Sequence, residues 1–165
     1  MEAASRTTGG RPEEDALKGL IAAVESDPKN DRALNTLGNW YYDHRQYEEA
    51  ILQYEKAKQL QPDEWIYESN IGDAYRALRE WDKAIEHYQR ATSAARSGND
   101  WAYNGLGLAY YYKKDYLQAI KSYQQALQLK PDATYYVNLA DACRQAGHFD
   151  DAVDYCENAK QIDDR

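Results

Sequence analysis

The side chains that could perform acid–base or nucleophilic chemistry are few and lie far apart in this sequence. The three histidines are His44, His87 and His148, and none has a cysteine, aspartate or serine at the spacing of a catalytic motif. A metal site needs three or four converging ligands, and no such cluster is visible. A glycine-rich phosphate loop is also missing. We therefore predict a protein that is not an enzyme and uses no metal ion or other cofactor.

The composition argues against several classes of partner. The 165 residues include 28 acidic and 20 basic side chains, giving a formal net charge of −8. A protein that binds duplex nucleic acid would instead need clustered lysines and arginines. Apolar runs are too short for membrane insertion, and residues 1–12 lack the apolar stretch of a secretory signal. We predict a cytoplasmic protein that binds neither nucleic acid nor membranes.

Small and aromatic residues recur along the chain at intervals of 33 to 35 residues. The series Gly38, Gly72, Gly107 and Ala140 defines these intervals. Self-similarity of this period is the sequence signature of a repeat protein. Three further columns keep the same intervals: Ala50, Ala84, Ala119 and Ala152; Tyr47, Trp81, Tyr116 and Phe149; and Ala57, Ala91, Ala126 and Ala159.

Within each repeat the apolar residues follow the spacing of two amphipathic helices. Leu34, Leu37 and Tyr41 recur every three to four residues, and the polar stretch 43–46 separates them from a second such pattern. A glycine inside a helix costs about 1 kcal/mol relative to alanine, which is tolerable where a neighbouring helix must come close. We expect repeats over residues 31–64, 65–99, 100–132 and 133–165, preceded by a half-repeat helix at 12–28 and a flexible tail at 1–11.

These columns together resemble the tetratricopeptide repeat. The resemblance implies an all-α, right-handed α-solenoid of helix-turn-helix units with about nine helices. It also implies that the first helices of the repeats line a concave groove, which is the usual ligand site of this family. The matching pattern is Leu37-Gly38, Tyr41, Ala50, Tyr54, Ala57 and Pro62 in the first repeat, while the fourth repeat carries Ala140, Cys143 and Cys156 in place of glycine and tyrosines.

Cys143 and Cys156 stand in columns where the other repeats have tyrosines that we expect in the core. One interpretation is a pair of small buried thiols. The other is a disulfide between the two helices of the fourth repeat, and the sequence is compatible with both.

Helical spacing selects the residues that would face the groove. An apolar group around Trp101 has the composition of a binding hot spot, and asparagine amides could donate to and accept from an extended peptide backbone. Arg76 and Arg144 each follow an aspartate by three residues, so each could pair with it or bind a ligand carboxylate. The candidate groove residues are Asn35, Asn39, Tyr42, Ile66, Asn70, Asp73, Arg76, Trp101, Asn104, Leu108, Tyr111, Tyr112, Asn138, Asp141 and Arg144.

A more specific function implied by the resemblance is disfavoured. Some tetratricopeptide co-chaperones hold the C-terminal carboxylate of heat-shock chaperones with two asparagines and three basic residues. Asn39 and Asn70 match the amide positions, but the basic positions are occupied by Asn35, Trp101 and Gly105. Without the three cations the charge-assisted hydrogen bonds of such a clamp are lost.

We therefore predict a non-catalytic protein-interaction module, an adaptor or scaffold that binds a peptide segment of a partner protein in the groove. Two alternatives stay open. The array could be structural and associate with a second copy through its uncapped ends. It could also be a fragment of a longer tetratricopeptide protein that regulates an attached enzyme.

Overall fold

The computed structural model describes residues 12–94 and 99–164, so the tail expected at residues 1–11 lies outside the described residues. The described part contains nine helices, as the repeat pattern predicts, and no strands. Their bounds are α1 Pro12–Ser26, α2 Asp31–Asp43, α3 Tyr47–Leu60, α4 Trp65–Ala77, α5 Trp81–Ala94, α6 Asp100–Tyr112, α7 Tyr116–Leu129, α8 Ala133–Ala146 and α9 Phe149–Asp163.

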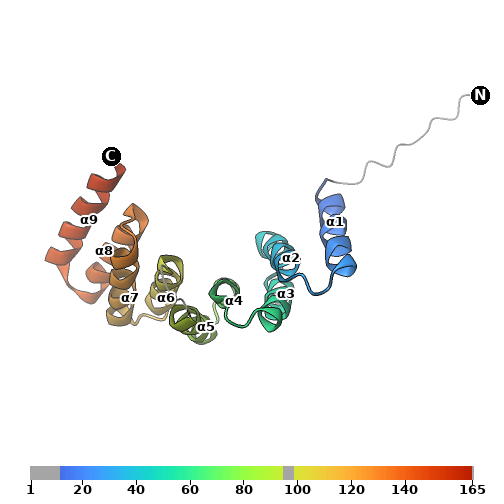
Figure 1. Ribbon diagram of the computed structural model, residues 1–165. Helices are drawn as coiled ribbons and strands as arrows, with labels where there is room; N and C mark the ends of the chain where they lie inside the picture. Colours follow the sequence, from blue (N-terminus) through green and yellow to red (C-terminus); the bar gives the residue numbers. More distant parts are fainter. Residues whose placement is uncertain (1–11, 95–98, 165) are drawn as a thin grey trace, which may run out of the picture.

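The helices follow one another along an arc, with α2, α4 and α6 toward its inner side and α3, α5 and α7 toward its outer side (Figure 1). Among the described residues, no helix has the length and apolar character needed to cross a membrane.

Several helices begin at a residue whose side chain accepts a hydrogen bond from a free backbone N–H. Asn30, Asn99, Asp115 and Asp132 cap α2, α6, α7 and α8 in this way. At α4 the capping position is occupied by Glu64, whose side chain makes no such bond. A side-chain cap of this kind thus marks the start of four of the nine described helices.

The turns inside the repeats reverse the chain through one residue with a left-handed backbone. Arg45, Arg79 and Lys114 have φ angles of 60°, 61° and 67°, and Gly147 has 84°. In the first three turns a non-glycine residue bears the steric cost of this conformation. In the fourth turn glycine removes that cost.

We expect Lys114→Gly to raise the free energy of unfolding by about 0.5 kcal/mol, because relief of the left-handed strain outweighs the added entropy of the unfolded chain. The adjacent Lys113 has a φ of −74° and pairs with Asp82 on the surface, so it provides a control in which glycine relieves no left-handed strain. Lys113→Gly should lower the free energy of unfolding. Urea denaturation of both variants measures the difference, and equal shifts would contradict this account of the turn.

In the first three repeats a tyrosine of the second helix packs against a glycine of the first helix. A Cβ atom on Gly38 would lie 2.5 Å from Cε1 of Tyr54, and one on Gly107 would lie 2.5 Å from Cε1 of Tyr123. In the fourth repeat both members change together, because Ala140 and Cys156 replace the glycine and the tyrosine. The loss of the ring makes room for the added Cβ.

The two ends of the array are less buried than its centre. No residue of α1 is buried, although Val24 packs against the core cluster that contains Leu34. Cys143 is buried, whereas Cys156 is exposed and both thiols are free. The interpretation of Cys156 as a buried core residue was therefore wrong, since no described helix covers the outer side of α9.

Candidate binding groove

A cavity of about 320 Å³ lies among helices α2, α3, α4 and α6. Six of the residues that line it belong to the predicted groove set, and Tyr54 was missed because its column pattern indicated only a core residue. The structure thus brings part of the predicted set together at the junction of the first three repeats. The lining residues are Asn39, Tyr42, Tyr54, Asn70, Asp73, Arg76 and Trp101.

Asp73 lines this cavity and is the centre of a hydrogen-bond network with its neighbours. Its Oδ1 atom accepts from the hydroxyl of Tyr88 at 2.6 Å and from Nη2 of Arg76 at 3.0 Å. Its Oδ2 atom accepts from Nε1 of Trp101 at 3.1 Å. One carboxylate therefore fixes an arginine and an indole that come from different helices.

Tyr88 is the buried member of the hydrogen-bond network around Asp73. It has no exposed surface, and its hydroxyl also accepts a hydrogen bond from Nε of Arg76 at 3.2 Å. Burial, reinforced by the charge of Asp73, raises the pKa of Tyr88 well above its ordinary value. The hydroxyl consequently stays protonated and serves as a donor to Asp73.

Trp101 lies at the start of α6 with its indole largely in solvent, at 55% exposure. The hydrogen bond to Asp73 holds this large apolar surface over the cavity. An exposed, oriented tryptophan is a common anchor of peptide and protein interfaces.

The asparagines form pairs between neighbouring first helices. Nδ2 of Asn70 donates to Oδ1 of Asn35 at 2.8 Å, and Nδ2 of Asn138 donates to Oδ1 of Asn104 at 3.0 Å. Between α4 and α6 the corresponding residues are Ser69 and Gly105, and the buried Ser69 hydroxyl has no hydrogen-bond partner among the described residues. The Asn–Asn hydrogen bond between neighbouring first helices is therefore missing between α4 and α6, the junction at which Trp101 lies.

Several predicted groove residues lie elsewhere. Ile66 lines a separate cavity near Asp31. Tyr112 stacks on Trp81, with ring centroids 5.2 Å apart, and both line a third cavity that also contains Arg76. Leu108 is half-buried against the core cluster of α7 and α8 and does not line the cavity around Trp101.

The predicted groove residues of α6 and α8 form hydrogen bonds and ion pairs with one another. The hydroxyl of Tyr111 donates to Asp141, which also accepts from Nε of Arg144 at 3.0 Å. Asn104 is only 9% exposed, and its side-chain oxygen accepts the hydrogen bond from Asn138. Arg76 and Arg144 both pair with the aspartate three residues before them, which is the first of the two predicted interpretations.

The histidines do not converge on one site. The ring of His44 stacks on Trp40, His87 contacts Glu68, and His148 lies 3.9 Å from Asp151. In residues 12–94 and 99–164 no group of three or more His, Cys, Asp or Glu side chains is placed to hold a metal ion.

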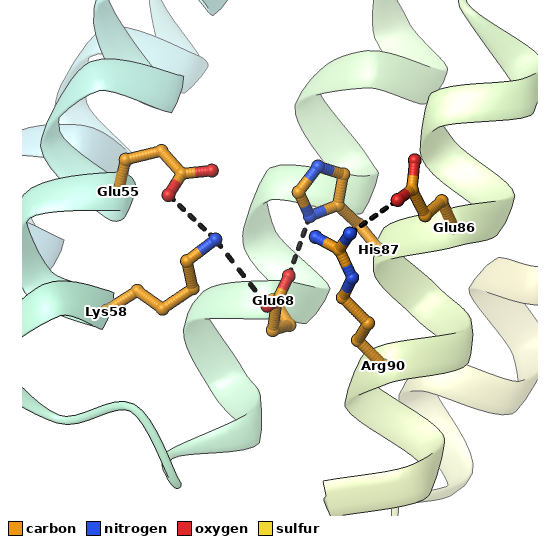
Figure 2. A network of polar contacts seen from close by, with 6 residues as sticks. All are labelled: Glu55, Lys58, Glu68, Glu86, His87 and Arg90. Atoms are coloured by element: carbon orange, nitrogen blue, oxygen red, sulfur yellow. Dashed lines mark hydrogen bonds and ion pairs between the residues drawn. The ribbon is translucent and has the colours of Figure 1, made fainter.

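A largely buried polar network joins α3, α4 and α5 (Figure 2). Oε2 of Glu68 lies 2.6 Å from Nδ1 of His87, and its Oε1 lies 3.5 Å from Nζ of Lys58. The ring of His87 stacks on Tyr75 with centroids 5.3 Å apart. Glu68 thus links the second helix of one repeat to both helices of the next.

These contacts favour the ionised form of the Glu68 carboxyl group over the protonated form. Burial raises the pKa of its carboxyl group, but the hydrogen bond with His87 and the charge of Lys58 outweigh burial, so the net pKa lies below its ordinary value. A carboxylate with a lowered folded-state pKa stabilises the fold above its unfolded-state pKa. That contribution is lost as the pH falls through the folded-state value.

We expect Glu68→Gln to lower the free energy of unfolding by about 1 kcal/mol at pH 7, because the charge opposite Lys58 is removed. The difference from the wild type should shrink as the pH falls through the lowered folded-state pKa of Glu68, where the carboxylate becomes protonated. Glu86→Gln is the control, since Glu86 pairs with Arg90 on the surface and should contribute little. A difference that is constant from pH 7 to pH 3 would contradict the proposed role of the charge.

The described helices define the molecule as an α-solenoid built from repeated helix pairs. Two sequence models of the tetratricopeptide repeat match the chain, one over residues 64–132 and 100–165 and the other over residues 31–64. The chain belongs to the tetratricopeptide repeat family, which confirms the predicted fold class.

Curated relatives share the repeats but are much longer. BBSome complex member BBS4 of Xenopus tropicalis is 30% identical over 114 residues, which are 69% of this chain and 22% of the relative. Small glutamine-rich tetratricopeptide repeat-containing protein 2 of Saccharomyces cerevisiae is 28% identical over 135 residues, covering 80% and 39%. The Hsp70-Hsp90 organising protein of Plasmodium falciparum is 28% identical over 98 residues, covering 54% and 17%. The chain therefore spans well under half the length of these relatives.

Solved structures share the arrangement of the helices. A crystal structure of MamA superposes with a TM-score of 0.82 at 26% sequence identity, covering 92% of this chain and 89% of that one. PilF of Pseudomonas aeruginosa superposes with a TM-score of 0.80 at 20% identity, covering 90% and 68%. At 20% identity, the similarity to PilF shows a shared fold alone.

Proposed function

We propose that the chain is a non-catalytic protein-interaction module that binds an extended peptide segment of a partner protein in the groove around Trp101. The observation that carries this proposal is the cavity of about 320 Å³ in which six predicted groove residues meet. It combines an exposed indole, a cation and two amides, which are the groups that peptide recognition uses.

The hydrogen bonds inside the protein determine what the amides offer to a ligand. Tyr54 donates to the oxygen of Asn39 at 2.8 Å, so the NH₂ group of Asn39 is left to donate to a peptide carbonyl. Asn70 gives an amide hydrogen to Asn35, so its own oxygen is left to accept from a peptide N–H. This donor–acceptor pair matches the backbone of an extended segment.

The charge of the cavity favours a ligand segment without a dominant negative charge. Arg76 is neutralised by Asp73, with which it forms an ion pair at 3.0 Å. The positions that would be basic in a carboxylate clamp have other roles here. Asn35 accepts from Asn70, Trp101 donates to Asp73, and Gly105 contacts the ring of Tyr88.

The comparisons support protein binding at the level of the family. The names of two relatives describe a member of a complex and an organising protein for Hsp70 and Hsp90. Their partners belong to those proteins, and for this chain they support only the general class of interaction module.

The test is affinity capture from a cell extract with three forms of the protein. Wild type and Leu52→Ala should retain the same partner, because Leu52 is 54% exposed but lies on α3 outside the cavity. Trp101→Ala should lose that partner. Capture by all three forms would place the interface outside this groove.

A further inference from the structure

The outer side of α9 is an apolar stripe that no described part of the chain covers. Phe149 is 65% exposed, Val153 is 58% exposed, and Cys156 is exposed as well. These three residues follow the i, i+4, i+7 spacing that places side chains on one face of a helix. In Figure 1, α9 forms the outer end of the arc.

In the internal repeats a helix buries the equivalents of Val153 and Cys156, whereas Trp81 and Tyr116, the equivalents of Phe149, are half-buried. On α5 the equivalent residues Ile85 and Tyr88 are 8% and 0% exposed, and they share a core cluster with Leu106 of α6. On α7, Ile120 and Tyr123 are 9% and 1% exposed and cluster with residues of α8. The α9 stripe therefore has the register of a surface that receives a helix.

The charges beside the stripe are mainly acidic, and one lysine, Lys160, continues the stripe in the last turn of α9. Asp150, Asp154 and Glu157 each follow a residue of the stripe and form an acidic row beside it. In the described part of the chain no basic side chain lies within ion-pair distance of these three carboxylates. A helix with lysines or arginines beside its apolar face would complement the row.

A second copy of the chain does not supply that charge. The opposite end of the array is α1, which begins with Glu13, Glu14 and Asp15. The whole chain carries a formal net charge of −8. Stacking α9 of one copy on α1 of another would bring two acidic surfaces together.

The small side chain of Cys156 determines which residue of a docking helix fits against α9. Where the ring of Tyr88 meets the next helix, that helix has Gly105, and a Cβ there would lie 2.4 Å from Cε1 of the ring. Cys156 has no ring, so a helix that docks on α9 needs no glycine at this point. A bulky apolar side chain such as leucine can fill the space instead.

We propose that the Phe149–Val153–Cys156 face of α9 binds a basic amphipathic helix of a partner protein, with a bulky apolar residue seated over Cys156. This interaction uses the end of the array and is independent of the peptide groove. Its ligand is a helix rather than an extended segment.

The test uses fluorescence anisotropy with two labelled synthetic 14-residue peptides at physiological salt. One has leucines at helical i, i+3, i+4 spacing and lysines elsewhere, and the other has glutamates in place of the lysines. The wild type should bind the lysine peptide and not the glutamate peptide. Phe149→Ser/Val153→Ser should weaken that binding at least tenfold, whereas Leu117→Ser/Leu129→Ser should not, because these exposed leucines lie on α7.

A second variant tests whether a bulky apolar residue of the bound helix packs over Cys156. Ala140→Gly/Cys156→Tyr restores the glycine–tyrosine pair of the internal repeats and should weaken binding of the leucine-containing peptide while the helical circular dichroism is kept. Unchanged binding by both α9 variants would overturn the proposal. So would a wild-type oligomer at micromolar concentration that Phe149→Ser/Val153→Ser converts to monomer, because the occupant would then be a second copy.

Discussion

Gly105→Ala is expected to lower the free energy of unfolding by about 2 kcal/mol. The new Cβ would lie 2.4 Å from Cε1 and 2.6 Å from Cζ of Tyr88, distances that force the ring or the helix to move. The ring is fully buried and also packs on Gly72 of α4, so it has little freedom to shift. Overpacking of this kind costs about 3 kcal/mol, from which the better helix propensity of alanine removes about 1 kcal/mol.

The matched control is Gly19→Ala in α1, where a Cβ would meet no atom within 4 Å. That variant gains helix propensity without a clash and should not lower stability. Denaturation with urea, followed by circular dichroism, measures both. If Gly105→Ala were as stable as Gly19→Ala, the close approach of α6 to Tyr88 would be contradicted.

The second large effect is on binding. Trp101→Ala should weaken the affinity for the captured partner segment at least 30-fold, equivalent to about 2 kcal/mol, because it removes the main apolar surface over the cavity. Stability should fall by no more than about 1 kcal/mol, since the indole is 55% exposed and the substitution removes one hydrogen bond to Asp73.

Isothermal titration calorimetry with the partner segment measures this loss, and thermal unfolding of the free variant measures stability. Leu52→Ala again serves as the control, with an unchanged dissociation constant expected. A large loss of stability in Trp101→Ala would instead show that the indole supports the fold. An unchanged affinity would remove it from the binding site.

The sequence predicts the fold well because packing residues repeat. Each repeat needs a small residue where its two helices meet, so the glycine and alanine columns recur at intervals of 33 to 35 residues. The fourth repeat is harder to interpret, since Cys156 occupies a buried column but lies at the end of the described array. Burial depends on the neighbouring repeat, which a column pattern within one repeat does not contain.

The groove is less predictable than the fold, because helical spacing gives the direction of a side chain but not its partners. Leu108 has the helical spacing expected of a groove residue, yet it packs against the core formed by α7 and α8. Tyr54 belongs to a core column, yet it also lines the cavity. The network around Asp73 connects residues from three helices, and no spacing rule within a repeat indicates such a connection.

The central claim is that a partner segment lies against Trp101. The chain has four tryptophans, Trp40, Trp65, Trp81 and Trp101, so a ¹⁵N-labelled sample gives four indole N–H signals in a two-dimensional NMR spectrum. Trp101→Phe identifies the signal of Trp101. On titration with the captured partner segment, we predict that this signal shifts most and that those of Trp40 and Trp65 stay in place. A bound complex in which the Trp101 signal does not move would contradict the proposed groove.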